Sequence, residues 1–171
     1  MTRLSISIVL LLSFLIFYSK AYPADEADSL RGLRGVYVLI WDLPSEIERK
    51  GLLTKDQIRT DVELKLRTAG IRVLCLNKPT MPENPVFFVY VNVHYAAIGD
   101  KRVGFAFDVH CSLRQVVYLE RDSTIKNWAT TWDRRASGIG SENFERIRNE
   151  IKYQVDIFIN DYVSVNPKGG N

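Results

Sequence analysis

The chain has 171 residues, of which 46% are hydrophobic and 25% are charged, and its formal net charge at pH 7 is +3. These fractions are typical of a globular protein and exclude an intrinsically disordered chain. Charges of both signs are interspersed, so the sequence gives little electrostatic reason to expect nucleic acid or an anionic membrane surface as a partner.

The amino-terminal segment has the order of regions found in a secretory signal peptide. Arg3 precedes an uncharged apolar run over residues 4–17, and the small residues Ser19 and Ala21 stand at the positions that signal peptidase inspects. The apolar run is shorter than the roughly 20 residues of a membrane-spanning helix. We therefore expect cleavage after Ala21, with an uncleaved anchor or a cut after Ala24 as the alternatives.

The remainder is long enough for one domain with one core. Removal of the signal peptide, residues 1–21, lowers the formal net charge from +3 to +1. Residues 22–31 are polar and acidic, which predicts a flexible lead-in. We expect a single α+β domain over residues 32–165 and a tail over residues 166–171.

The first half of the domain predicts a strand, a helix and a second strand. Residues 35–41 are a dense β-branched and aromatic run, which is typical of a buried strand. A helix over residues 54–69 and a short strand over residues 71–76 follow, and this order favours a crossover with the two strands parallel. The three prolines of residues 77–85 predict a loop.

Long strands with a clean alternation follow. Residues 86–98 and 104–119 predict an antiparallel hairpin with a turn near Gly99. Apolar side chains share one face of it: Phe87, Val89, Val91, Val93 and Tyr95 in the first strand, and Phe105, Phe107, Val109, Cys111 and Leu113 in the second. Residues 126–133 favour one more strand, with Trp128, Thr130 and Trp132 on one side, and residues 134–140 read as a loop.

Both predicted helices have a cap signal and one apolar face. Thr54 and Gln57 form a capping-box pattern, and Ser141 is the expected N-cap of a long helix over residues 141–163. The apolar positions recur at helical spacing: Ile58, Val62, Leu66 and Ala69 in the first helix, and Phe144, Ile147, Ile151, Val155, Phe158 and Tyr162 in the second. The pattern predicts a two-layer α+β sandwich, in the order β-α-β-β-β-(β)-α, with a mixed sheet of four or five strands and both helices on its apolar face.

Polar side chains gather on the other face of the hairpin, which makes this face the candidate binding surface. They are Tyr90, Asn92, His94, Asp108, His110 and Arg114. With a four-residue hairpin loop, His94 lies opposite Asp108 and His110 lies opposite Asn92, so that the histidines are diagonal neighbours. Such a group could bind a transition metal. A polar face open to solvent explains the same pattern without a ligand, so we predict no metal, no cofactor and no catalytic residue.

The two cysteines leave a disulfide open. Cys111 is expected to point into the core, while the direction of Cys75 at the end of its strand is ambiguous. Export permits a disulfide, but a buried thiol needs no partner. We expect two free, buried thiols rather than a bridge.

Four stretches resemble a group of uncharacterised bacterial exported proteins and together cover most of the chain after the signal peptide. They are GVYVLIWDLP, TKDQIRTDVELKLRTAGIRVL, YVNVHY and FINDYVSVNP. The resemblance implies a bacterial envelope setting and supplies no activity and no site residues. In element order alone, the chain resembles small α+β domains of periplasmic proteins such as the amino-terminal domain of TolB, which transfers no function.

These observations predict an exported, non-catalytic binding or interaction domain of the bacterial envelope, in the periplasm or outside the cell. The polar sheet face and a patch of Tyr153 and Ile157 are the expected contact surfaces. The expected partner is an envelope protein or a small ligand, with no nucleic acid and no stable membrane insertion after signal cleavage. The alternatives are a carrier of a small ligand or metal that uses the same sheet face and, ranked lowest, an enzyme.

Overall fold

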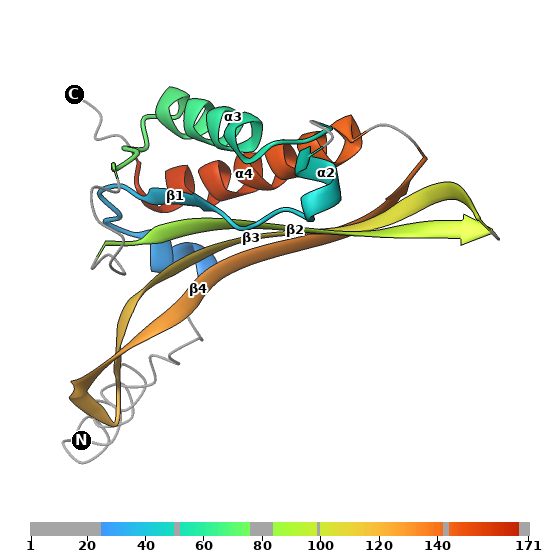
Figure 1. The fold of residues 1–171 in the computed structure, drawn as a ribbon. Helices are drawn as coiled ribbons and strands as arrows, with labels where there is room; N and C mark the ends of the chain where they lie inside the picture. Colours follow the sequence, from blue (N-terminus) through green and yellow to red (C-terminus); the bar gives the residue numbers. More distant parts are fainter. Residues whose placement is uncertain (1–24, 50–51, 76–83, 99, 142–143, 168–171) are drawn as a thin grey trace, which may run out of the picture.

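Four strands form one mixed sheet, and two helices pack over one of its faces (Figure 1). The computed structural model describes residues 25–49, 52–75, 84–98, 100–141 and 144–167. In chain order the elements are η1 (Glu26–Leu30), β1 (Tyr37–Ile40), α2 (Ser45–Arg49), α3 (Lys55–Thr68), β2 (Val86–Ile98), β3 (Lys101–Leu119), β4 (Asp122–Gly140) and α4 (Glu145–Val165). The sheet has the order β1-β2-β3-β4, in which β1 is parallel to β2 and the other neighbours are antiparallel. The predicted two-layer α+β sandwich is confirmed.

The segment expected to be a flexible lead-in, residues 22–31, contains the short 3-10 helix η1. Leu30 is completely buried and belongs to the hydrophobic core, and Ser29 Oγ donates a hydrogen bond to the carbonyl of Thr131 at 2.9 Å. One apolar side chain of this segment therefore belongs to the core of the domain. The predicted signal peptide, residues 1–21, lies outside the described residues.

Helix α3 forms where its cap signal predicts. Thr54 Oγ1 accepts a hydrogen bond from the amide of Gln57, and the Gln57 side chain accepts one from the amide of Thr54, so the capping box is complete. Gly70 ends the helix with φ of 84°, a left-handed conformation that suits glycine. The buried side chains of α3 are those of the predicted apolar face, namely Ile58, Val62 and Leu66.

The predicted second strand over residues 71–76 is reduced to a single parallel bridge between Val36 and Val73. Two hydrogen bonds hold it, from the amide of Val36 to the carbonyl of Arg72 (2.9 Å) and from the amide of Leu74 to the carbonyl of Val36 (2.8 Å). The expected parallel direction is confirmed. The prediction of a full strand at these residues is wrong, because the parallel partner of β1 in the sheet is β2.

Both cysteines are free, as predicted, but their environments differ. Cys111 lies on β3 and is completely buried. Cys75 is exposed, which corrects the expectation of two buried thiols. The cause is the shortened second strand, since Cys75 lies beyond the bridge at Val73 and has no place in the sheet.

The hairpin of β2 and β3 has the predicted faces but a different register. The ten apolar side chains expected on one face are all buried except Tyr95, which is partly buried against the core. The turn is tight, with Ile98 opposite Lys101. The pairing register of the hairpin shifts between Ala96 and Ala97, close to this turn. The pairing shifts by two residues relative to the expected one. A shift of two leaves every side chain on its face, because side-chain direction repeats every two residues.

Strand β4 extends to Gly140, so the predicted loop over residues 134–140 is wrong. Two of its glycines explain why a loop composition forms a strand. A Cβ on Gly138 would lie 2.6 Å from the Phe107 ring, and a Cβ on Gly140 would lie 2.4 Å from the Phe105 ring. Glycine therefore makes room at these positions for two core aromatic rings on the neighbouring strand.

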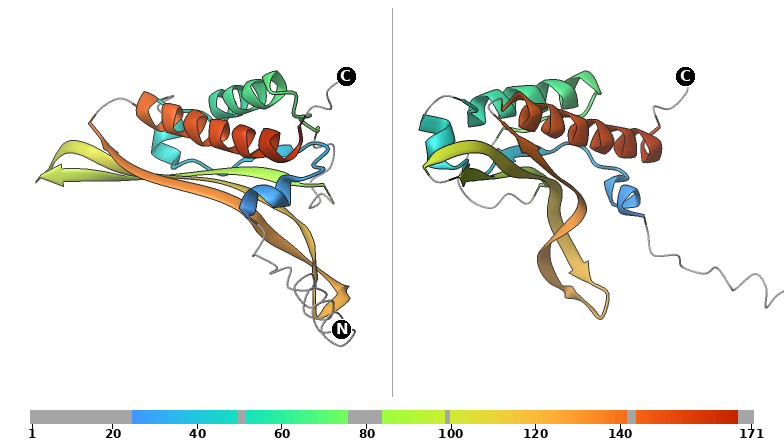
Figure 2. Two further views of the ribbon diagram at one scale, coloured as in Figure 1. Left: turned by 180° about the vertical axis from the view of Figure 1, so that it is seen from behind. Right: turned by 90° about the vertical axis from the view of Figure 1, so that its right-hand side faces the viewer.

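Beyond the body of the sheet, β3 and β4 continue as a two-stranded arm that bends away from the helices (Figures 1 and 2). The arm starts after Arg114, which pairs with Val86, the first residue of β2. A register shift there leaves Thr131 without a partner across the ladder. Trp132 consequently faces the core, whereas Thr130 is exposed, so the predicted common side of Trp128, Thr130 and Trp132 is wrong.

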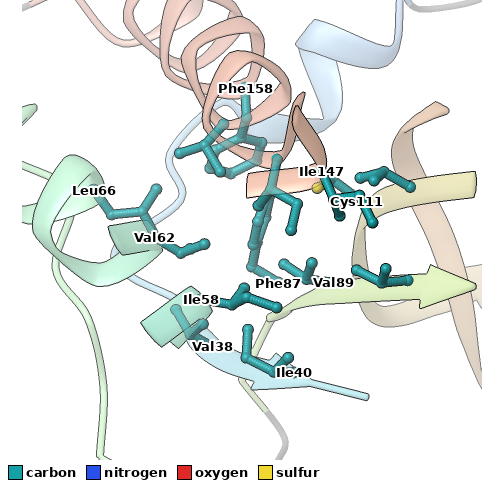
Figure 3. Close-up of a cluster of buried hydrophobic side chains, with 14 of the residues drawn as sticks. Val38, Ile40, Ile58, Val62, Leu66, Phe87, Val89, Cys111, Ile147 and Phe158 are labelled. Carbon is teal, nitrogen blue, oxygen red and sulfur yellow. The ribbon is translucent and has the colours of Figure 1, made fainter. Parts of the chain in front are cut away.

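Helix α4 begins at Glu145, with Phe144 at its N-cap position, so the expected cap at Ser141 is wrong. Ser141 directly follows β4, which ends at Gly140, and precedes the helix by several residues. The apolar stripe is confirmed, since five of its members are buried and Tyr162 is partly buried: Phe144, Ile147, Ile151, Val155 and Phe158. Figure 3 shows core side chains from α3, the sheet and α4 meeting around Phe87.

Candidate functional site

The sheet face opposite α3 and α4, which we call the outer face, has neither of these helices over it (Figures 1 and 2). Even-numbered residues of β2 and β3 lie on this face, because their odd-numbered neighbours fill the core. The outer face carries all six side chains of the predicted binding surface. Tyr90, His94 and Asp108 are exposed there, and Asn92, His110 and Arg114 are half-buried.

One line of side chains crosses the outer face from edge to edge. Tyr90 pairs with His110, and His110 pairs with Arg135 on β4. Trp41 continues the line on the far side, since it follows the pair of Ile40 and Val89 and its amide donates to the carbonyl of Val89 at 2.9 Å. We call Trp41, Tyr90, His110 and Arg135 the cross-strand row.

The observed register separates the two histidines. His94 lies opposite Ala106 and His110 lies opposite Tyr90, so they are not the diagonal neighbours that the four-residue loop predicted. Four residues along a strand correspond to roughly 13 Å. Among the described residues, no three His, Cys, Asp or Glu side chains lie together as a group that could hold a metal ion.

Polar side chains of the outer face bind mainly to one another. Asn92 Nδ2 lies 2.8 Å from His94 Nε2, within hydrogen-bond distance. Ser137 Oγ donates a hydrogen bond to Asp108 across β3 and β4. These contacts fix the positions of the side chains relative to one another.

His110 occupies the centre of the cross-strand row, and its surroundings lower its pKa. Burial lowers the pKa of its imidazole, and the nearby positive charge of Arg135 lowers it further. The carboxylate of Asp133, whose Oδ2 lies 3.2 Å from His110 Nε2, acts in the opposite direction but does not reverse the shift. His110 is therefore neutral over a wider pH range than a solvated histidine.

Aromatic rings form one end of this surface. The rings of Trp41 and Phe88 are tilted, with centroids 6.5 Å apart. The guanidinium carbon of Arg114 lies 5.5 Å from the centroid of the Phe88 ring, a cation–π arrangement. Arg114 thus belongs to the outer face although a register shift follows Leu113.

Sequence reasoning missed three contributors to this surface. Trp41 and Phe88 lie at or within segments that the sequence predicts as strands. The alternation that assigns Tyr90 to the outer face also assigns Phe88 to it, so this signal could have identified Phe88. Arg135 lies in a segment whose composition predicts a solvated loop, so alternation could not assign its side chain to a face of the sheet. Strand β4 places Arg135 beside His110, where its Nε donates to Asp133 Oδ2 at 3.2 Å.

The second predicted contact surface, on α4, is not formed as expected. Tyr153 is exposed, at 61% of its accessible area. Ile157 is partly buried and packs against the hydrophobic core. The two side chains therefore do not form one exposed patch, because the buried side of α4 is wider than its central stripe.

Comparisons with known proteins leave the family of this chain open. No family model matches the sequence, and the comparison with curated proteins gives no match either. The solved structure of rare lipoprotein B from Shewanella oneidensis matches with a TM-score of 0.34 and 8% identity, over 76% of this chain and 96% of that chain. A minor lipoprotein from Acinetobacter baumannii matches with a TM-score of 0.37 and 12% identity, over 82% of this chain and 99% of that chain. Both likenesses are too low to support a conclusion about function.

Among the described residues, no helix combines the length and the apolar composition that crossing a bilayer demands.

Proposed function

We propose that this protein is an exported, non-catalytic binding module that holds a protein partner against the outer face of its sheet. The observation that carries the proposal is the cross-strand row, which aligns Trp41, the residue that follows β1, with Tyr90, His110 and Arg135 on the three neighbouring strands. Tryptophan, tyrosine and arginine are the residue types that contribute most to binding energy in protein interfaces.

The row is accessible along most of its length. Adjacent strands lie about 4.8 Å apart, so the row spans roughly 14 Å. Trp41 is 53% exposed at one end, and the Arg135 side chain is 72% exposed at the other. A stable interface covers about 800 Å² on each partner, which is more than the row provides. The partner therefore also covers neighbouring apolar side chains such as Ile139, which is 71% exposed.

The two ends of the row select different chemistry. At one end, the rings of Trp41 and Phe88 present an apolar surface. At the other end, Arg135 uses its Nε for Asp133, and its guanidinium has further N–H groups that can donate to a partner. The complementary partner presents an apolar side chain to Trp41 and a carboxylate to Arg135. Charge complementarity of this kind sets orientation and specificity.

Export rests on the sequence. The signal-peptide pattern that ends at Ala21 and the resemblance to bacterial exported proteins support an envelope location, in the periplasm or outside the cell. Mass spectrometry of the protein from its native host tests this part, with Tyr22 as the expected first residue. A chain that retains Met1 would contradict it.

Site-specific photo-crosslinking in the producing cells tests the binding surface. A photoreactive amino acid replaces Trp41 or Tyr90 in separate variants, and Tyr153, which is exposed on α4, serves as the matched control. We expect one protein adduct, the same from both row positions and absent from the control. Purified partner must then bind the wild-type protein and bind Arg135→Ala more weakly. Equal labelling from Tyr153, or no adduct from either row position, would contradict the proposal.

A further inference from the structure

A cleft of about 470 Å³ lies where the segment that leads into β1 meets the start of β2. Its walls include Arg34, Arg72, Leu33, Leu74, Pro85 and Gln115, and we call it the arginine cleft. Arg31 also lines it, and none of the described residues that line it is acidic. The volume falls within the range of roughly 300–1,000 Å³ that is usual for small-molecule sites.

Two of the arginines have no ion-pair partner among the described residues. In the described part of the chain, no carboxylate lies within ion-pair distance of Arg34 or Arg72. Arg31 differs, because its Nη2 lies 2.7 Å from Asp28 Oδ1. The guanidinium groups of Arg34 and Arg72 therefore keep their N–H donors available, in a geometry that matches carboxylate and phosphate oxygens.

The backbone brings these two arginines to the same place. The bridge between Val36 and Val73 holds the two segments side by side, with the amide of Val36 donating to the carbonyl of Arg72 at 2.9 Å. Gly35 permits this approach, because a Cβ there would lie 2.7 Å from the carbonyl oxygen of Arg72. The close approach at Gly35 thus brings the segments of Arg34 and Arg72 together, and both arginines line the cleft.

The remaining walls are partly apolar and partly fixed. Leu33 is buried and Leu74 is half-buried, so they supply apolar surface beside the arginines. Gln115 Nε2 donates to the carbonyl of Ser29 (3.3 Å) and to Thr131 Oγ1 (2.9 Å), which holds its amide in position. An apolar wall with a few oriented polar groups is the usual composition of a small-molecule site.

We propose that the arginine cleft binds a small organic anion, with its oxyanion group on Arg34 and Arg72 and its apolar part against Leu33 and Leu74. The cleft lies apart from the cross-strand row, so the two proposals stand or fall separately. A carboxylate and a phosphate share the chemistry that the arginines recognise, and the experiment distinguishes them.

Isothermal titration calorimetry of the purified protein with four probes tests the proposal. Phenyl phosphate and benzoate carry both an oxyanion and a ring, inorganic phosphate lacks the ring, and benzyl alcohol lacks the charge. We expect saturable one-to-one binding of phenyl phosphate, benzoate or both. The probe with the lower dissociation constant identifies the oxyanion that the cleft prefers. Inorganic phosphate should bind more weakly than phenyl phosphate. Binding of benzyl alcohol as tight as that of the anions, or no saturable binding of either ring-bearing anion, would overturn the proposal.

Substitutions in the cleft complete the test. Arg34→Ala and Arg72→Ala should each weaken binding of the preferred probe about tenfold or more, since each removes a charge-assisted hydrogen-bond donor. Arg121→Ala is the matched control, because Arg121 is exposed at the turn between β3 and β4, away from the cleft. Both cleft arginines are exposed, so their substitution should leave the fold intact, as far-UV circular dichroism can verify. Equal affinity in the cleft variants and the control would overturn the assignment to Arg34 and Arg72.

Discussion

At the scale of single residues, the two free cysteines differ most in chemistry. Burial raises the pKa of the Cys111 thiol far above its ordinary value, and the charge of Glu150 adds to this rise. Cys75 is exposed. Because the thiolate is the reactive form, Cys75 should react with a thiol reagent in the folded protein and Cys111 should not. Ellman's reagent should therefore count one fast thiol in native buffer and two in denaturant without reductant. A count of zero in denaturant would mean that a disulfide exists.

A second prediction at this scale concerns His110 and pH. Burial lowers the pKa of the folded imidazole, so folding favours its neutral form. As the pH falls through about 6.5, the histidine of the unfolded chain therefore binds a proton while His110 of the folded protein stays neutral. The contribution of His110 to the free energy of unfolding is complete above that pH and is lost as the pH falls below it.

Urea denaturation of the wild type and of His110→Gln, at a series of pH values from neutral to mildly acidic, measures this effect. The free energy of unfolding of the wild type should fall relative to that of the variant below about pH 6.5. Parallel curves for the two proteins across this range would show that His110 does not carry the pH dependence.

At the scale of elements, α4 contributes the aromatic centre of the core. The Phe158 ring lies 4.8 Å from that of Phe87 and 4.9 Å from that of Trp132, between ring centroids, and Phe158 is completely buried. Phe158→Ala should lower the free energy of unfolding by about 3–5 kcal/mol, the usual cost of emptying such a site. Tyr153→Ala, on the exposed side of the same helix, should change it by no more than about 0.5 kcal/mol. Similar effects of the two substitutions in denaturant titrations would show that α4 is peripheral.

Helix α4 also binds α3 through charged groups, which the sequence could not reveal. Asp61 and Lys65 stand one turn apart on α3, a spacing that suits an ion pair, but Asp61 accepts hydrogen bonds from Arg148 on α4, one of them 3.0 Å long. Lys65 instead contacts Asp156 at 2.6 Å. The Arg148 guanidinium holds the pKa of the Asp61 carboxyl below its usual range. Local spacing identifies partners along one helix, whereas the packing of two helices decides which partner is nearer.

The elements that were predicted correctly are those specified by local patterns. The capping box at Thr54 and the two-residue alternation of β2 and β3 are read directly from the chain. The errors arise where long-range packing decides the structure. Gly138 and Gly140 suggest a loop by composition, and they lie in a strand because the rings of Phe107 and Phe105 need the space.

At the scale of the whole molecule, the same distinction applies to the candidate site. The sequence predicted the polar outer face, since alternation assigns each side chain to a face. It could not align the cross-strand row, because the register depends on the tight turn at the end of β2 and on the true length of β4. Arg135 enters the row through both of these long-range features.

The central claim is that the outer face binds a protein partner, and the most direct test is the affinity of the crosslinked partner for matched variants. Tyr90→Ala should raise the dissociation constant about thirtyfold or more, the effect of truncating a strong interface contact. Tyr153→Ala removes an exposed tyrosine from α4 and should leave the dissociation constant within about twofold of the wild type, because it lies outside the proposed interface. A partner that binds Tyr90→Ala as tightly as it binds Tyr153→Ala would contradict the account.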